Sequence, residues 1–175
     1  MTKILLTGQP GCGKTTIIKR AIAKLNRPYC GFCTSEIRDS GERLGFAIDT
    51  LSEPRRSGIL AHVDMKAAQR VGKYGVNIEE FERLAVPELI EGLSKGILLV
   101  IDEIGKMELF STTFRQLAEK ALSGDSDVLA SIMLGPHPFC DRLKKLPGIR
   151  LKRIDRGNRE AVLDEVLELL SQHDS

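Results

Sequence analysis

The chain has 175 residues, of which 42% are hydrophobic and 29% are charged, and its formal net charge is +2. This length suits one domain with a single core, residues 1–175, and the composition is that of a globular protein rather than a disordered one. Because there is no stretch of about 18 apolar residues and the net charge is mild, we expect no membrane span, no nucleic-acid partner and a cytoplasmic location.

The first predicted elements are a strand, a glycine-rich loop and a helix. Lys3 to Thr7 is a short apolar strand, and residues 14–25 carry apolar side chains at helical spacing. The loop that joins them matches the phosphate-binding pattern G-x-x-x-x-G-K-[ST] at every fixed position. Its glycines let backbone N–H groups turn towards an anion, and Lys14 supplies a point charge for the β- and γ-phosphates. We therefore expect a nucleoside triphosphate to bind, with the Thr15 hydroxyl on Mg²⁺, through Gly8, Gln9, Pro10, Gly11, Cys12, Gly13, Lys14, Thr15 and Thr16.

A β-hairpin is predicted after the first helix. Tyr29 to Arg38 and Leu44 to Leu51 have the composition of strands, and Asp39 to Glu42 has that of a turn. A further short strand is expected at residues 59–63, whereas residues 66–75 show no clear period. We therefore expect a β-hairpin insertion between about Tyr29 and Val63.

Cys30 and Cys33 form a C-x-x-C pair, a spacing found in dithiol redox centres and in zinc sites. A zinc site needs a second pair of ligands, which the sequence does not offer. Residues three apart in a strand point to opposite faces, so we favour ordinary part-buried thiols over a redox pair.

The second half of the chain alternates helices and strands. Asn77 is a predicted N-cap with Glu80 three residues on, and we expect Pro87 to kink or split the helix that follows. Residues 97–101 are an unbroken apolar run, typical of a strand that is buried on both faces of a parallel sheet. The later segments are a helix at 113–122, a strand at 128–133, a short segment near 140–146, a strand at 149–154 and a helix at 159–170. This order predicts the α/β class, with a mainly parallel sheet flanked by helices.

Two carboxylates, Asp102 and Glu103, end the apolar run. A metal ion on the phosphates of a nucleotide needs a carboxylate, and Asp102 at the end of a strand is placed to hold Mg²⁺ directly or through water. Glu103 is placed to orient or deprotonate an attacking water. Together with the phosphate loop, this pair predicts a hydrolytic nucleotide site with Lys14 and Glu103 as its catalytic residues.

Two other function classes compete with hydrolysis. Residues 102–105 also fit D-x-x-G, the γ-phosphate sensor of regulatory GTPases, but the guanine-reading tetrapeptide N-K-x-D is absent from the sequence. A kinase needs a pocket for an acceptor, which the sequence does not exclude. The alternatives are therefore a nucleotide-dependent kinase with an unknown acceptor and a nucleotide-switched binding protein.

The sequence also resembles a known family over nearly its whole length, the small P-loop nucleoside-triphosphatases of thermophilic bacteria and archaea, which has a vertebrate member called cancer-related nucleoside-triphosphatase. The most specific part is Asp102-Glu103-Ile104-Gly105-Lys106-Met107-Glu108-Leu109, and Asn158-Arg159-Glu160 departs conservatively from the family's Asn-Arg-Asp. Other matching segments are residues 8–15, Gly31-Phe32, Glu36, residues 43–46, Leu60-Ala61 and residues 71–76.

The resemblance implies a kinase-like P-loop fold related to the RecA-like group and Mg²⁺-dependent hydrolysis of nucleoside triphosphates with loose base preference. It also implies that Glu103 activates water and that the nucleotide site is lined by Leu98, Leu99, Val100, Ile101, Asp102, Glu103, Ile104 and Gly105. This fold would bring Asn158 and Arg159 near the base. We expect ATP, GTP and pyrimidine triphosphates as substrates, and the sequence identifies no protein partner.

Four further polar residues lie outside the phosphate loop and the acidic pair. Ser131 lies in the strand after the acidic one and either senses the attacking water or is a plain buried hydroxyl; we favour the second. Arg43, Arg55 and Arg56 lie in the hairpin region, where arginine can bind phosphate oxygens bidentately, but we favour surface positions for all three.

Overall fold

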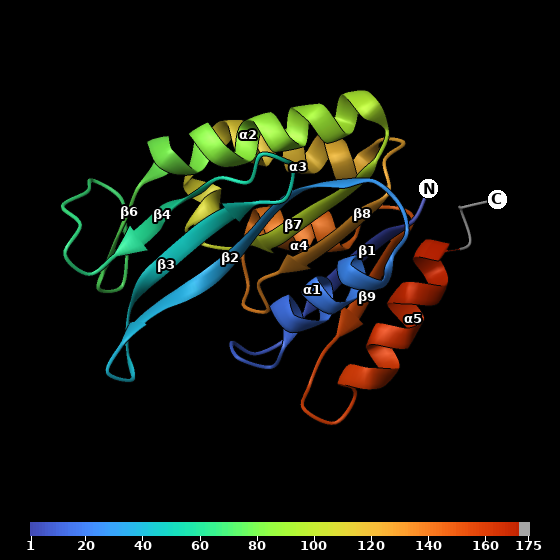
Figure 1. The fold of residues 1–175 in the computed structure, drawn as a ribbon, viewed down its shortest axis with the longest axis horizontal. Helices are drawn as coiled ribbons and strands as arrows, with labels where there is room; N and C mark the ends of the chain where they lie inside the picture. Colours follow the sequence, from blue (N-terminus) through green and yellow to red (C-terminus); the bar gives the residue numbers. More distant parts are fainter. Residues whose placement is uncertain (172–175) are drawn as a thin grey trace.

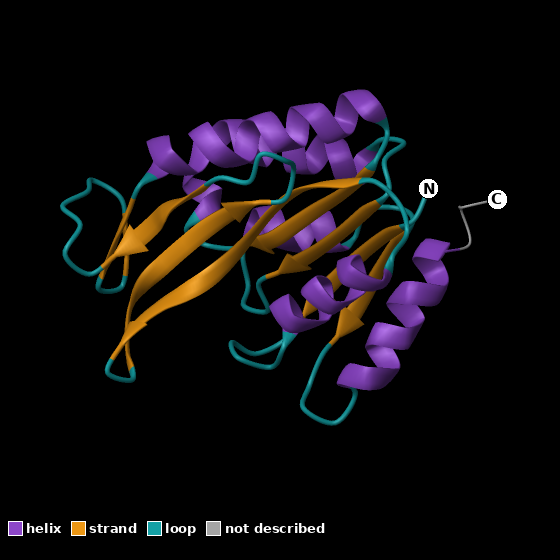
Figure 2. Cartoon of the chain, in the orientation of Figure 1, coloured by secondary structure: helices purple, strands orange, loops and turns teal. Residues whose placement is uncertain are grey.

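A computed structural model describes residues 1–171, which fold into nine strands, five α-helices and one short 3₁₀ helix (Figures 1 and 2). In chain order the elements are β1 (Lys3–Thr7), α1 (Lys14–Lys24), β2 (Tyr29–Asp39), β3 (Glu42–Thr50), β4 (Ser57–His62), β5 (Arg70–Val71), β6 (Tyr74–Val76), α2 (Ile78–Lys95), β7 (Leu98–Ile104), the 3₁₀ helix η1 (Glu108–Phe110), α3 (Thr112–Ser123), β8 (Val128–Ile132), α4 (Pro138–Lys144), β9 (Ile149–Arg153) and α5 (Arg159–Ser171). None of these helices has the length and apolarity to cross a membrane.

All nine strands join one sheet in the order β5-β6-β4-β3-β2-β7-β8-β1-β9. The neighbours from β2 to β9 pair in parallel, and those from β2 outwards to β5 pair antiparallel. One strand, β8, separates β1 from β7. In a parallel sheet the carboxyl ends of the strands meet at one edge, so the segments after β1 and β7 come together there.

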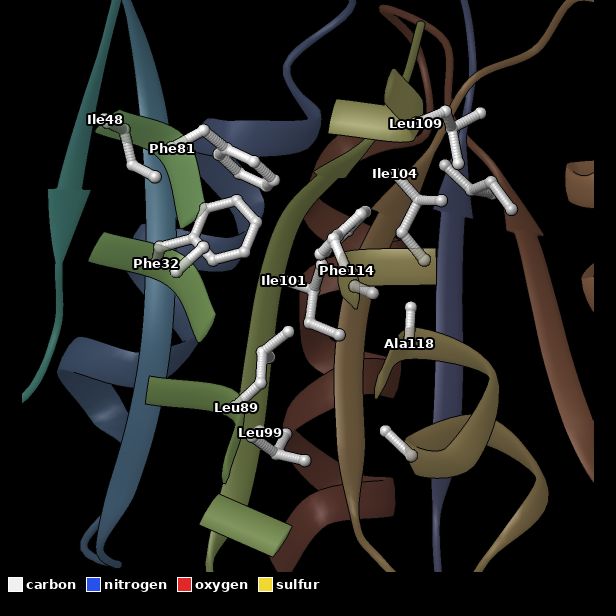
Figure 3. Close-up of a cluster of buried hydrophobic side chains, with 14 of the residues drawn as sticks. Phe32, Ile48, Phe81, Leu89, Leu99, Ile101, Ile104, Leu109, Phe114 and Ala118 are labelled. Carbon is white, nitrogen blue, oxygen red and sulfur yellow. The ribbon is translucent and has the colours of Figure 1, made fainter. Parts of the chain in front are cut away.

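Helices cover both faces of the sheet. The side chains of α2, α3 and α4 share one core cluster with the sheet, and those of α1 and α5 share a second cluster on the other face. In the first cluster the rings of Phe32, Phe81 and Phe114 meet edge to face with centroids 5.2 to 5.9 Å apart (Figure 3). Such pairs add about 0.5 to 1.5 kcal/mol each beyond the area that they bury. This core holds β2 and β7 at fixed positions beside the helices.

The predicted hairpin is confirmed, and its first strand has a second role. β2 pairs antiparallel with β3, from Phe32 opposite Thr50 to Asp39 opposite Glu42, and it also pairs in parallel with β7. The close approach of β2 to β7 requires Gly31, because a Cβ there would lie 1.9 Å from the carbonyl oxygen of Val100. Gly31 also has φ +123°, which is unfavourable for other residues. The hairpin is therefore continuous with the parallel sheet through β2.

Three local predictions can be compared with the structure: the effect of Pro87, the N-cap at Asn77 and the segment 66–75. Pro87 does not split the predicted helix, since α2 runs unbroken from Ile78 to Lys95. Pro87 is exposed, so water can hydrate the carbonyl group that loses its helical hydrogen bond. The N-cap prediction is confirmed, because the Asn77 side chain accepts a hydrogen bond from the Glu80 N–H. Residues 66–75, which have no clear period, include β5 and part of β6, which form a short hairpin.

Candidate active site

The phosphate loop connects β1 to the first turn of α1. Residues 8–13 lie between the two elements, and Lys14 is the first residue of the helix. Gly13 has φ +107° and precedes that helix as its N-cap residue. The Lys14 ammonium is folded back over the loop, donating to the carbonyl oxygen of Gly8 at 3.0 Å and to that of Gln9 at 3.5 Å. A helix N-terminus behind a glycine loop is suited to bind phosphate.

The two predicted carboxylates lie at the end of β7, facing this loop. Glu103 Oε2 is 3.8 Å from Lys14 Nζ, so the acidic strand and the phosphate loop are in direct contact. The peptide bond between Asp102 and Glu103 is cis. The chain thus brings together Lys14, Asp102 and Glu103, which are separated by almost 90 residues in the sequence.

Asp102 is a buried carboxylate with one oxygen still available. Its Oδ1 accepts a hydrogen bond from Ser131 Oγ at 2.5 Å, whereas Oδ2 has no hydrogen-bond partner among residues 1–171. Burial raises the pKa of Asp102, and the hydroxyls of Ser131 and Thr15 and the charge of Lys14 oppose this rise. A buried, unpartnered carboxylate oxygen beside a threonine hydroxyl is suited to a hard divalent cation.

Glu103 has a different environment from Asp102. About one-third of its side chain is exposed, at 33%, so water reaches the carboxylate. Burial raises its pKa, the Lys14 charge lowers it, and the Asp102 charge raises it further. A carboxylate that touches both the phosphate-binding lysine and solvent can orient a water molecule.

The structure adds to this site Glu108, for which the sequence analysis proposed no role. Its carboxyl group is buried, with 4% of the residue exposed. A Cβ on Gly105 would lie 2.8 Å from Glu103 Oε1 and 3.0 Å from Glu108 Oε2, so both carboxyl groups flank the same glycine. Burial and the Glu103 charge raise the pKa of Glu108 to about 8. Sequence alone marked Glu108 only as part of a matching motif, because its burial depends on the turn that follows β7.

The loop between β9 and α5 lies beside the phosphate loop. A Cβ on Gly13 would meet Arg159 Nε at 3.0 Å, and this Nε is buried without a hydrogen-bond partner among the described residues. Asn158 instead closes its own loop: its Oδ1 accepts from the Asp155 N–H at 3.0 Å, and its Nδ2 donates to the Arg153 carbonyl at 2.8 Å. The structure thus places Arg159 beside the phosphate loop, while the amide of Asn158 is already engaged, and the nearness of both residues to the base stays a prediction.

Several residues that the resemblance placed along the nucleotide site have side chains buried in the cores on the two faces of the sheet. Leu99, Ile101 and Ile104 are fully buried in the core beneath α2 and α3, and Leu98 and Val100 are fully buried in the core beneath α1. Alternate side chains of β7 point to opposite faces, and helices cover both. Their side chains therefore pack in the two cores that support Asp102 and Glu103, and their place along the nucleotide site stays a prediction. Gly105 is also buried, whereas the loop exposes Gln9, Pro10, Gly11 and Thr16.

The two cysteines of the C-x-x-C pair lie on opposite faces of the sheet. Cys30 packs in the core with α2, and Cys33 packs in the core with α1. Both thiols are free, and burial raises the pKa of each to about 12. This arrangement agrees with the prediction of ordinary thiols rather than a redox pair, which needs adjacent thiols and an accessible thiolate, but both cysteines are fully buried and not part-buried as predicted.

The chain is similar over nearly its whole length to proteins named nucleoside-triphosphatases. Residues 3–167 match a family model described as NTPase. The nucleoside-triphosphatase THEP1 of Thermotoga petrophila is 44% identical over 168 residues, which cover 96% of this chain and 92% of that protein. The crystal structure of THEP1 from Aquifex aeolicus matches with a TM-score of 0.88 and 36% identity, covering 97% of this chain and 99% of that one. The solution structure of a human cancer-related nucleoside triphosphatase matches with a TM-score of 0.81 and 32% identity, covering both chains completely.

Proposed function

This chain belongs to the NTPase family, and we propose that it hydrolyses nucleoside triphosphates to the diphosphate and phosphate, with Mg²⁺ and with little preference among bases. The family and its named relatives make it a nucleoside-triphosphatase. The α/β P-loop fold expected from the sequence is confirmed by the two solved structures. The metal, the range of bases and the roles of individual residues are our proposals.

The observation that carries the proposal is the contact between Lys14 and Glu103 beside the phosphate loop. The Lys14 ammonium now donates to two loop carbonyls, and a bound triphosphate offers it stronger, charged acceptors. Lys14 and the N–H groups of the loop would then stabilise negative charge on the phosphoryl group that is transferred.

The residues present fit Mg²⁺. Mg²⁺ is usually held by one or two carboxylates together with substrate phosphates and water. Asp102 Oδ2 and the Thr15 hydroxyl supply that kind of incomplete site, and no cluster of three metal-binding side chains occurs within residues 1–171. When bound, the ion would neutralise charge on the β- and γ-phosphates. Ser131 would hold the Asp102 carboxylate in place through its hydrogen bond.

Glu103 acts on water in this proposal. It accepts the proton of the attacking water while the oxygen of that water bonds to the γ-phosphorus and the bond to the leaving diphosphate breaks. Partial exposure gives the carboxylate access to water, and the Lys14 charge favours its ionised form. General base catalysis of this kind contributes about 10²- to 10⁴-fold.

Loose base preference is expected because the residues brought together at this site do not contact the base. In this proposal the phosphates, the metal and the water, which all nucleoside triphosphates share, are bound by Lys14, Asp102 and Glu103. Strong discrimination of about 10⁴-fold needs buried polar groups that go unpaired with the wrong base. Both ends of the Asn158 amide already bond within the β9–α5 loop, which leaves Arg159 to make a stacking or charge contact with any nucleotide.

Phosphate release by the purified chain tests the proposal. We expect hydrolysis of ATP, GTP, CTP and UTP with kcat/KM values within about tenfold of one another, and loss of activity with excess EDTA that added Mg²⁺ restores. Glu103→Gln should bind Mg·NTP and turn it over at least about 10²-fold more slowly. Normal turnover by this variant would contradict the role of Glu103 and favour a kinase, and a thousandfold preference for one base would contradict the open specificity.

The same assay separates the two alternatives. A kinase would transfer phosphate to an acceptor in preference to water, so phosphate release would fall when a suitable acceptor is added. A nucleotide-switched binding protein would hydrolyse very slowly alone and be accelerated by a partner.

A further inference from the structure

A cavity of about 420 Å³ lies beside the candidate active site, between α1 and the strands β2 and β3. Its wall includes Lys19 and Ile22 from α1 and Cys33 from β2. No residue of the phosphate loop lines it, and neither do Asp102 or Glu103. The volume is within the range of small-molecule sites, about 300 to 1,000 Å³.

The cavity is one strand away from the proposed metal-binding carboxylate. Cys33 on its wall is the parallel partner of Asp102 in the β2–β7 pairing, so the two Cα atoms lie at the same level of the sheet. A ligand at the Cys33 end of the cavity would therefore bind beside the proposed metal site.

The lining of the cavity is positively charged. Lys19, Arg55 and Arg56 line it, against one carboxylate, Asp49. Within residues 1–171 the side chains of Lys19 and Arg56 form no hydrogen bond or ion pair, whereas Arg55 pairs with exposed Glu53 and also interacts with Tyr29. Cations gathered on one concave surface attract anions more strongly than the same cations spread over a flat one. Arginine also binds phosphate oxygens in a bidentate manner.

The remaining residues of the lining are suited to contact the ring of a base or a sugar. Tyr29 presents an aromatic side chain, and Ile22 and Leu51 add apolar surface. Thr50 and Ser57 add hydroxyl groups on the same wall. An aromatic side chain beside arginines can stack on a base or pack against a sugar while the cations bind a phosphate.

We propose that this cavity is a second ligand site, which binds a small phosphate monoester carried on a ring, such as a nucleoside or sugar monophosphate, while a triphosphate occupies the neighbouring loop. The inference goes beyond the proposed hydrolysis. It rests on the proposed function only because it requires that the phosphate loop can bind a triphosphate. Lys19 and Arg56 bind the phosphate, and Tyr29 contacts the ring.

Calorimetric titration of monophosphates into the chain tests the second site. The protein is first saturated with Mg²⁺ and a non-hydrolysable ATP analogue, and this titration alone reports whether the triphosphate site exists. AMP, ribose 5-phosphate and adenosine are then titrated into the saturated protein. We expect a monophosphate to bind and adenosine to bind at least tenfold more weakly. Tighter binding of AMP than of ribose 5-phosphate identifies the ligand class as nucleotides, and equal binding identifies it as sugar phosphates.

Matched double variants locate the binding. Lys19→Gln with Arg56→Gln should weaken binding of the monophosphate at least tenfold. Lys24→Gln with Arg150→Gln removes the same charge from exposed positions outside the cavity and should change it less than twofold. Absence of monophosphate binding to the saturated protein would overturn the proposal, and so would an equal loss in both double variants.

Discussion

Glu108→Gln should make the chain more stable relative to the wild type as pH rises. Burial raises the pKa of Glu108 from its usual value of 4.5 to about 8, with a further rise from the charges of Glu103 and Asp102, while backbone N–H groups oppose it. The folded protein thus holds a proton that the unfolded chain has released across this range. The favourable contribution of that proton is complete below about pH 4.5 and is lost as pH rises to about 8.

The size of this effect follows from the shift. Each unit of pKa difference corresponds to 1.36 kcal/mol, so the wild type should lose about 5 kcal/mol of unfolding free energy from Glu108 between pH 4.5 and pH 8. Glutamine keeps the shape of the side chain and cannot ionise. Asp102 and Glu103 also have raised pKa values, but both proteins share them, so they largely cancel in the difference between the two.

Urea unfolding at pH 5, 6, 7, 8 and 9 measures the difference. We expect the free energy of unfolding of Glu108→Gln, minus that of the wild type, to rise by several kcal/mol from pH 5 to pH 8 and then to level off. Glu168→Gln, which changes an exposed carboxylate on α5, should stay within about 0.5 kcal/mol of the wild type throughout. A flat difference for Glu108→Gln would refute the view that this carboxyl group is buried and neutral.

Three further changes test the site and the sheet. Lys14→Ala should lower kcat for NTP hydrolysis at least about 10²-fold, because it removes the charge that faces the phosphates, and near-normal turnover in the folded variant would contradict the site. Ser131→Ala removes the hydrogen bond to Asp102 Oδ1, so the pKa of Asp102 should rise and the acid limb of the pH–rate profile should move to higher pH; an unmoved limb would contradict this coupling. Gly31→Ala should lower the free energy of unfolding in urea by at least about 3 kcal/mol, because its Cβ would lie 1.9 Å from the Val100 carbonyl oxygen. Gly72→Ala is the control: a Cβ there would have no atom within 4 Å, so its φ of +58° alone should lower this free energy by about 1 kcal/mol.

The parts of the site that sequence predicted are those encoded by local pattern. The phosphate loop needs consecutive residues of fixed type, and the structure places Lys14 at the start of α1 as the motif requires. The carboxylates after an apolar run were expected at a strand end, and β7 ends there. The N-cap at Asn77 is also local, because its partner Glu80 is three residues away. Each of these features depends on a few neighbouring residues, so no tertiary contact was needed to predict it.

The features that sequence missed depend on tertiary contacts. β5 and β6 are short, and they become strands only because β6 pairs with β4 at the edge of the sheet and β5 pairs with β6. The burial of Glu108 results from the turn after β7, in which Leu109 N–H bonds to the Gly105 carbonyl. Pro87 was expected to kink or split its helix because proline removes a helical hydrogen bond. Its exposed position on α2 makes the loss of that bond tolerable. The resemblance assigned the whole run from Leu98 to Gly105 to the nucleotide, although packing on both faces of β7 buries its apolar part.

The environments of the three carboxyl groups at and just after the end of β7 explain how one short segment could serve several roles in hydrolysis. Burial raises the pKa of Asp102, the hydroxyls of Ser131 and Thr15 and the charge of Lys14 oppose this rise, and a bound cation would favour the ionised form that a metal ligand needs. Glu103 reaches solvent and the charge of Lys14, which suits a group that accepts a proton from water. Glu108 has neither a cation nor solvent, and its raised pKa keeps it neutral at pH 7, so it adds no third negative charge beside the triphosphate. A third ionised carboxylate there would repel the anionic substrate, so the burial of Glu108 preserves the attraction that the phosphate loop provides.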